Sequence, residues 1–184
     1  MKPPSFEQIA DVLRPLIRSE LSKLAAAHPD SSFYGVALDC NVEYGDVFVS
    51  ANTEAALRAR CLKSYVTPNR TLEKAMSELK WALGDWTYYC INAESDEWAK
   101  QWRPIAQQIE TYLFGLCDDC DDDDQASDWH EQFLETMCRI LLSLENENAF
   151  DVLRRDPDFR LCCADHDEPL EDGEARMQRI RESG

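Results

Sequence analysis

The sequence predicts an α+β fold: a small antiparallel sheet packed by helices, with a long helix leading the chain. Two observations predict it. Residues 33–51 read as a β-hairpin, and the apolar residues on either side of them recur at helical spacing. Because a two-stranded hairpin is only marginally stable by itself, helices must cover its apolar face. At 184 residues, the chain suits a single domain spanning residues 1–184.

The hairpin is predicted from alternating side chains and from its turn. Tyr34, Val36 and Leu38 fall on one face of the first strand, because successive side chains of a strand point to opposite faces. Residues 41–45 are turn material, in which Gly45 can best adopt a positive φ. The return strand follows directly from this turn.

Two further segments are expected to add strands to the same sheet. Residues 86–91 (WTYYCI) are rich in aromatic side chains, which favour strands. Residues 159–164 (FRLCCA) read as a last strand near the end of the chain. The predicted sheet is therefore antiparallel, with helices on one face.

The leading helix is expected from Ser5 to about Ala27. Ser5 and Gln8 form a capping box, and Pro15 should kink the helix without ending it. Pro104 either kinks a later helix or marks the start of a new one. Five further helical segments are expected at residues 54–63, 71–83, 95–113, 128–144 and 171–182.

The net charge of the chain limits the kinds of molecule that it is expected to bind. The chain has 19 lysines and arginines against 36 aspartates and glutamates, a formal net charge of -17. Such a field repels nucleic acid and anionic lipid, so neither is an expected partner. The same field would speed encounter with a cationic protein, and a basic protein partner is therefore expected.

No run of about 18 apolar residues could span a bilayer, so no membrane segment is expected. The first residues, MKPPSFEQ, lack the charged-then-apolar build of a signal peptide. A cytoplasmic location is the resulting expectation. The eight cysteines are then expected to be reduced and mostly buried as small apolar residues.

An acidic linker is predicted at about residues 117–126, where a run of aspartates must stay solvated. Trp129 follows it at a predicted helix start and is expected to be exposed as an apolar anchor, whereas the other tryptophans are expected in the core. The predicted partner-binding residues are Asp118, Asp119, Asp121, Asp122, Asp123, Asp124, Asp128, Trp129 and Glu131.

A metal site is the alternative hypothesis. Cys117 and Cys120 have the C-x-x-C spacing of zinc and redox sites, and His130 or His166 could complete a ligand set. A structural zinc ion needs four ligands, however, and the neighbouring carboxylates would raise the thiol pKa values. The segment 165–168 (DHDE) combines a histidine with carboxylates, but neighbouring strand residues alternate faces and cannot converge without help from elsewhere.

No glycine-rich phosphate loop and no catalytic triad can be proposed from the spacing, so no cofactor and no catalytic residue is expected. The chain is expected to be a non-enzymatic interaction protein. A metal-binding protein or metal-dependent enzyme built on Cys117, Cys120 and His130 or His166 is the alternative.

Four segments together resemble a known bacterial family of uncharacterised proteins, DUF4303. They are HPDSSFYGVALD (28–39), SANTEAAL (50–57), LKWALGDWTYY (79–89) and FRLCCADHDE (159–168). The resemblance implies a compact α+β protein with no catalytic residues to carry over. Because small acidic families of this kind often accompany polymorphic toxin systems, it also implies the class of immunity proteins, inhibitors that mask a basic toxin domain.

Overall fold

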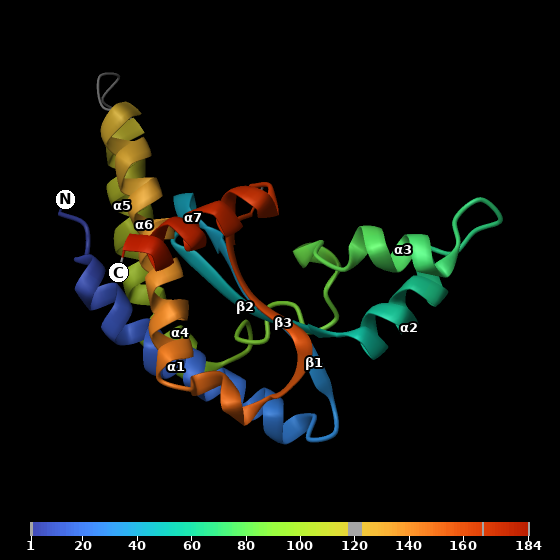
Figure 1. The fold of residues 1–184 in the computed structure, drawn as a ribbon. Coiled ribbons are helices and arrows are strands. Elements are labelled where there is room, and N and C mark those ends of the chain that lie inside the picture. Colours follow the sequence, from blue (N-terminus) through green and yellow to red (C-terminus); the bar gives the residue numbers. More distant parts are fainter. Residues whose placement is uncertain (1, 118–122, 167, 184) are drawn as a thin grey trace.

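The structure, a computed structural model, describes residues 2–117, 123–166 and 168–183 (Figure 1). In chain order, with η for a 3-10 helix, the elements are α1 (Phe6–Ala27), β1 (Ser32–Asn41), η1 (Val42–Tyr44), β2 (Asp46–Thr53), α2 (Glu54–Ser64), α3 (Leu72–Leu79), η2 (Leu83–Asp85), α4 (Asp96–Gln101), α5 (Arg103–Cys117), α6 (Asp123–Asn146), η3 (Ala149–Val152), β3 (Arg154–Asp165) and α7 (Leu170–Ser183). The α+β class, the long leading helix and the hairpin are confirmed. No helix in these ranges is both long and apolar enough to cross a membrane.

The sheet has the strand order β2-β1-β3 and is mixed. β1 pairs with β2 antiparallel, as the hairpin predicts, with Leu38 opposite Val49. β3 pairs with β1 in parallel, with Leu38 opposite Cys163, so the expectation of a purely antiparallel sheet is wrong. A parallel pair needs a long crossover connection, and the helices between β2 and β3 supply it.

The segment 86–91 does not form the expected third strand. It follows the outer edge of β2 with one isolated bridge, between Ala51 and Tyr88. Cys90 has a φ of 52°, which interrupts any strand there. The side chain of Asn92 then takes over the pairing: its Oδ1 accepts from the Val49 N–H at 2.8 Å, and its Nδ2 donates to the Val47 carbonyl at 2.9 Å.

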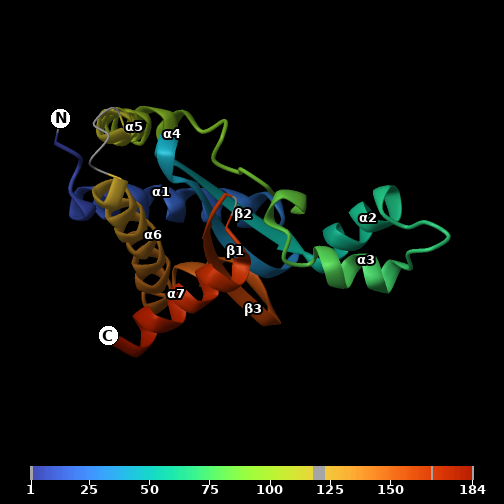
Figure 2. The ribbon, with the colours of Figure 1, turned by 90° about the horizontal axis from the view of Figure 1, so that it is seen from above.

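Both faces of the sheet are buried, where the sequence predicted helices on one face only. α2 and α3, which contribute to the second core, extend beyond the end of the sheet (Figure 2). Val36 and Leu38 face the main core, which α1, α5 and α6 complete. Tyr34 lies in a second core on the other face, under α2, α3 and Trp86. The register shifts between Phe33 and Gly35, and this irregularity breaks the alternation that placed Tyr34 beside Val36.

The leading helix forms as its sequence predicts. The Ser5 side chain accepts a hydrogen bond from the Gln8 N–H, and Pro15 lies inside the helix without ending it. Ile9, Leu13, Ile17 and Leu21, which recur at helical spacing, are fully buried. Pro104 is the second residue of α5, so it marks the start of a new helix, one of its two predicted roles.

Candidate functional site

A hollow of about 520 Å³ lies between η1, α5 and α6. We call it the acidic hollow; its lining residues are Glu43, Leu113, Phe114, Ala126, Ser127, His130 and Glu131. Phe114 is 51% exposed, and Tyr44 beside it is 46% exposed. Their rings meet edge to face with centroids 6.2 Å apart. Two large aromatic side chains therefore form an exposed apolar surface at this place.

The sequence holds η1 close against α5 through a glycine and a tryptophan. Gly45 ends η1 with a φ of 65°, and a Cβ on it would lie 2.8 Å from the Cα of Ala106. Only glycine allows both the positive φ and this approach. The indole N–H of Trp102 donates to the Gly45 carbonyl at 3.0 Å. These contacts fix Tyr44 next to α5.

Three exposed carboxylates lie on the elements that form the acidic hollow. Glu43 on η1, and Asp124 and Asp128 on the first turns of α6, are exposed. None of them forms an ion pair with a lysine or arginine in the part of the chain that the structure describes. Nearby, burial and the carboxylate of Glu110 together raise the pKa of Asp46. The negative charges on this side of the molecule thus repel each other.

The structure describes only some of the predicted partner-binding residues. Asp118, Asp119, Asp121 and Asp122 lie outside the described residues, and Asp123 is the first residue of α6. Asp124 and Asp128 are exposed beside the acidic hollow. α6 begins five residues before the predicted helix start. Carboxylates favour the first turn of a helix, where they meet the positive end of its dipole.

Glu131 lines the acidic hollow but is not free. Its oxygens accept hydrogen bonds from Arg176 at 3.1 Å and from Arg179 at 3.2 Å. The hydrogen bonds from Arg176 lower the pKa of Glu131. Glu131 therefore links α6 to α7 through ion pairs. Because its charge is compensated by two arginines, it would attract a cationic partner less than Glu43 or Asp124.

Trp129 is buried, and the prediction that it is exposed is wrong. It is 6% exposed and packs against Phe6, Tyr112 and Phe133, with ring centroids 5.4–5.9 Å apart. With α6 starting at Asp123, Trp129 lies in the second turn and faces the core. The spacing of Trp129, Phe133 and Met137, four residues apart, carries the signal for this burial. Phe114 and Tyr44, by contrast, are large aromatic side chains that are exposed.

A second polar site lies at the carboxyl ends of the parallel strands β1 and β3. Asp39 is 3% exposed, and its oxygens accept the Tyr89 hydroxyl at 2.9 Å and face His166 Nδ1 at 3.2 Å. Burial and the hydrogen bond to Asp39 raise the pKa of Tyr89. Asp165 accepts from His130 Nε2 at 3.0 Å and from the Val42 N–H at 3.3 Å.

The Asp165–His130 contact behaves as an ion pair. The hydrogen bond to Asp165 raises the pKa of His130. Burial alone would raise the pKa of Asp165, but the hydrogen bond and charge of His130, together with backbone hydrogen bonds from Val42 and His166, outweigh burial and lower it. Next to this pair, Arg176 is 4% exposed and lies between Glu168 and Glu131. We call Asp39, His130, Asp165, His166, Glu168 and Arg176 the strand-end cluster.

The paired charges of the strand-end cluster tie β1, β3, α6 and α7 together. In addition, His166, which bonds to Asp39 through Nδ1, lines a cavity of about 350 Å³ that Trp81 also lines. Within segment 165–168, Asp165 pairs with His130 from α6, and His166 pairs with Asp39 from β1. These neighbouring side chains therefore have separate partners, each supplied by another element.

The predicted metal site is not assembled by the residues that can be described. Among these, no group of three or more histidine, cysteine, aspartate or glutamate side chains is placed to hold a metal ion. His130 and His166 bond to two different carboxylates. Cys120 and the side chain of Cys117 lie outside the described part, so a site that includes them stays a prediction. Elemental analysis of untagged protein tests it.

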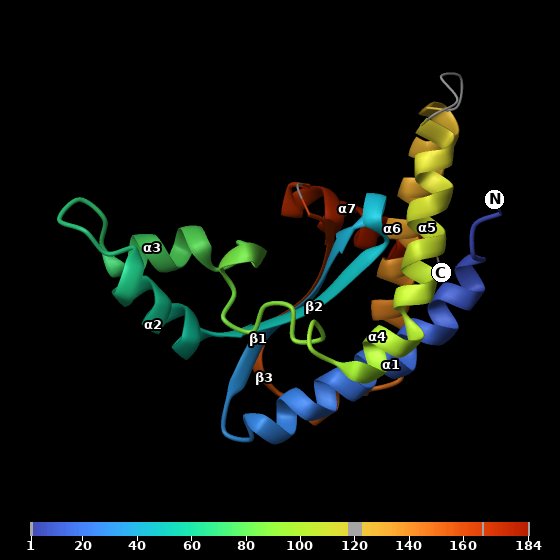
Figure 3. The ribbon, with the colours of Figure 1, turned by 180° about the vertical axis from the view of Figure 1, so that it is seen from behind.

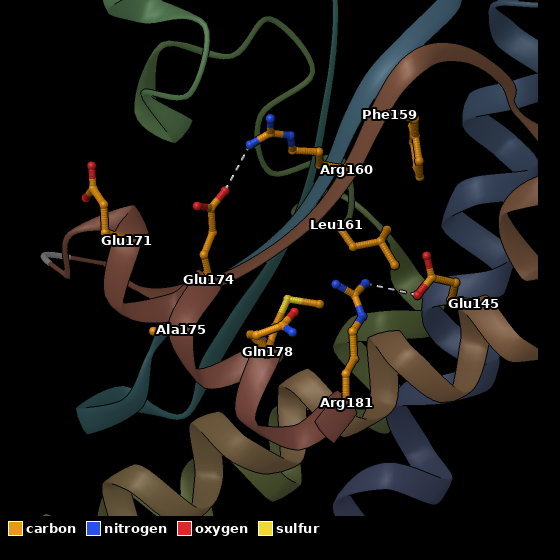
Figure 4. A pocket seen from close by; sticks show the side chains of 10 residues that line it. Glu145, Phe159, Arg160, Leu161, Glu171, Glu174, Ala175, Gln178 and Arg181 are labelled. Carbon is orange, nitrogen blue, oxygen red and sulfur yellow. Dashed lines mark hydrogen bonds and ion pairs between the residues drawn. The ribbon is translucent and has the colours of Figure 1, made fainter. Parts of the chain in front are cut away.

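A third hollow, of about 570 Å³, lies between β3 and α7 (Figure 4). Arg160 pairs with Glu174 at 3.5 Å, and Arg181 pairs with Glu145 at 3.1 Å. Both arginines of this groove are therefore paired with glutamates, and positive and negative charges lie side by side along it.

Comparison with known proteins identifies a family and nothing further. The model of a family described as a domain of unknown function, DUF4303, matches residues 13–182. No curated protein and no solved structure matches the chain. Because the matched residues cover nearly the whole sequence, the chain belongs to the DUF4303 family.

Proposed function

We propose that this protein is a non-enzymatic binding protein whose acidic hollow docks a basic protein, as an immunity-type inhibitor does when it masks a cationic toxin domain. The observation that carries the proposal is the exposed pair Tyr44 and Phe114, together with three exposed carboxylates on η1 and α6 that form no ion pair with any described residue: Glu43, Asp124 and Asp128. An apolar centre inside a charged rim is the usual anatomy of a protein interface.

The apolar centre would supply affinity. Aromatic side chains are frequent hot spots, and truncating one typically costs more than tenfold in binding. Phe114 stands at the edge of a preformed hollow, so a partner side chain can pack against its ring without rearranging the core. The partner is expected to insert an apolar or long aliphatic side chain there.

The charges would supply encounter rate and selectivity. Most lysines and arginines of the chain are already paired with its own carboxylates, for example Arg60 with Asp85 at 2.7 Å and Arg139 with Glu135 at 3.2 Å. The excess negative charge is therefore left to the solvent. An exposed field of this sign steers cationic partners and falls off with added salt. A basic toxin domain needs its lysines and arginines to bind an anionic substrate, and covering them would inhibit it.

The test first asks whether the gene beside this one encodes a secreted protein with a basic C-terminal domain, and then uses that domain as the binding partner. Its dissociation constant is measured by surface plasmon resonance for wild type, Phe114→Ala and Asp124→Lys. Phe114→Ala should weaken binding about tenfold or more through the off-rate. Asp124→Lys should slow association, with a smaller effect in high salt.

Two matched controls make the test specific to the hollow. Val152, 50% exposed on η3, is the apolar control, and Val152→Ala should leave binding unchanged. Asp30, exposed in the turn before β1, is the charge control, because Asp30→Lys makes the same change in net charge elsewhere. Binding that is insensitive to salt and to Phe114→Ala, or that both controls weaken equally, would contradict the proposal.

A further inference from the structure

Exposed large apolar side chains form two pairs among the described residues, and Val152 lies apart from both. Among the residues that the structure describes, five large apolar side chains are exposed: Tyr44, Leu62, Val66, Phe114 and Val152. Tyr44 and Phe114 belong to the acidic hollow. Leu62, 57% exposed, and Val66, 42% exposed, lie at the end of α2 and just beyond it.

The second pair lies on a basic arm in an acidic protein. Residues 54–80, which contain α2 and α3, carry six lysines and arginines against three glutamates, the reverse of the balance in the whole chain. α2 and α3 project from one side of the body (Figure 1). The buried side of α2 presents Leu57 and Cys61 to the second core.

The outer side of α2 combines positive charge with apolar surface. Arg58 and Lys63 are exposed, and neither forms an ion pair with a carboxylate of the described residues. Leu62 lies one turn after Arg58 and Lys63 follows it, so these three side chains lie on the half of α2 that faces away from the buried Leu57 and Cys61. Val66 is exposed just beyond the end of the helix. We call Arg58, Leu62, Lys63 and Val66 the arm face.

The arm face and the acidic hollow are complementary but cannot meet within one molecule. Each presents two exposed apolar side chains, and their unpaired charges have opposite signs. The arm lies on one side of the body, whereas α5 and α6 stand on the other in every view (Figures 1–3). Contact between the two surfaces therefore needs a second molecule.

We propose that the arm face of one copy docks into the acidic hollow of a second copy of this chain. Arg58 and Lys63 would pair with Glu43 and Asp124, while Leu62 packs against Phe114. This inference rests on the proposed function, because it uses the acidic hollow as the docking surface. A second copy would then compete with a basic toxin domain for the same hollow.

The contact would be head-to-tail and weak. It joins two different surfaces, so each docked pair keeps one free arm face and one free hollow, and association continues into a ring or a chain. One end of a helix buries less area than a stable dimer needs, and the net charge of -17 opposes assembly. Association should therefore be reversible, concentration-dependent and suppressed by salt.

Sedimentation velocity of the full chain over a concentration series, at about 50 mM and about 500 mM sodium chloride, measures this association. Wild type should form oligomers at low salt and return to monomer at high salt. An arm-reversed variant, Arg58→Glu with Lys63→Glu, and a hollow-reversed variant, Glu43→Lys with Asp124→Lys, should each weaken association at least about tenfold. All four positions are exposed and form no ion pair with another described residue, and circular dichroism checks that each variant folds.

Mixing the two variants is the decisive step. The hollow-reversed chain keeps the native arm, the arm-reversed chain keeps the native hollow, and the two reversed surfaces are complementary to each other. The equimolar mixture should therefore regain association although neither variant associates alone. Val152→Ala is the apolar control and should associate like wild type, whereas Leu62→Ala should weaken the contact.

The results that overturn the inference are distinct. A wild-type chain that stays monomeric up to about 1 mM, a mixture that fails to regain association, or oligomers that survive both reversals each contradict it. The arm-reversed variant retains Phe114 and Asp124, so it should still bind the basic toxin domain. If it does, and wild type does not self-associate, only the present inference fails. If toxin binding is instead insensitive to Phe114→Ala and Asp124→Lys, the proposed function fails.

Discussion

Replacing Gly173 with alanine should destabilise this protein, because α7 lies too close to β3 to admit a side chain. A Cβ on Gly173 would lie 2.1 Å from the carbonyl oxygen of Cys163 and 3.1 Å from its carbonyl carbon. These are backbone atoms of a buried strand, so the clash can be relieved only by moving α7. Overpacking of this kind costs about 1–3 kcal/mol. Alanine in place of a helical glycine returns about 0.5–1 kcal/mol.

The net loss of stability should thus be about 1–2 kcal/mol. Gly115→Ala is the matched control: the same exchange in α5, where a Cβ meets no atom within 4 Å. That variant should gain about 0.5–1 kcal/mol. Urea unfolding followed by circular dichroism gives the free energy of unfolding of all three proteins. If Gly173→Ala were as stable as wild type, the tight packing of α7 on Cys163 would be refuted.

Three further predictions concern side chains that hold the site in place. The His130–Asp165 pair should stabilise the fold most between about pH 4 and 6.5: its contribution is lost as the pH falls through the lowered pKa of Asp165, and lost as it rises through the raised pKa of His130. His130→Gln should therefore cost more stability near pH 6 than near pH 9 in urea unfolding, and an equal cost at both would contradict the pairing. Arg176→Met leaves Glu168 without its cation and should cost about 3 kcal/mol, measured the same way; a neutral effect would show that Glu168 finds solvent. Trp129→Ala empties a core position and should lower the free energy of unfolding by about 3–5 kcal/mol, whereas a change below about 1 kcal/mol would mean that Trp129 does not pack in the core.

Local rules in the sequence predicted the helices well. The Ser5 side chain caps α1 by accepting from the Gln8 N–H at 3.2 Å, and the Thr53 side chain caps α2 by accepting from the Ala56 N–H at 3.1 Å. The residues of each cap lie within a few positions of each other, so the cap can be recognised without knowing the rest of the fold. The hairpin followed for the same reason, because its turn at Gly45 is also local.

Pairings between distant segments were not predictable in the same way. Nothing near residues 159–164 fixes whether that strand runs parallel or antiparallel to β1, and the actual parallel register is what brings Asp39 beside Ala164. The strand-end cluster depends on that register. The aromatic content of segment 86–91 favoured a strand, but the positive φ of Cys90 and the side-chain bonds of Asn92 prevailed.

The candidate site was predictable in charge but not in shape. The acidic excess near the start of α6 is evident from composition, and Asp124 and Asp128 are exposed there. The aromatic part was assigned to Trp129, whereas Phe114 and Tyr44 provide it. Their meeting depends on the close approach of η1 to α5 at Gly45, which is a contact between segments about sixty residues apart and leaves no local trace.

Both margins of the sheet are closed by the protein itself. Asn92 and Tyr88 satisfy backbone groups along β2, while α7 packs onto the Cys163 carbonyl of β3, and the exposed start of β3 carries Pro157. Aggregation by strand addition, in which an unprotected sheet edge pairs with another chain, therefore finds few unpaired backbone groups here. The self-association proposed above would therefore rest on contacts between side chains, and a higher ionic strength would reverse it.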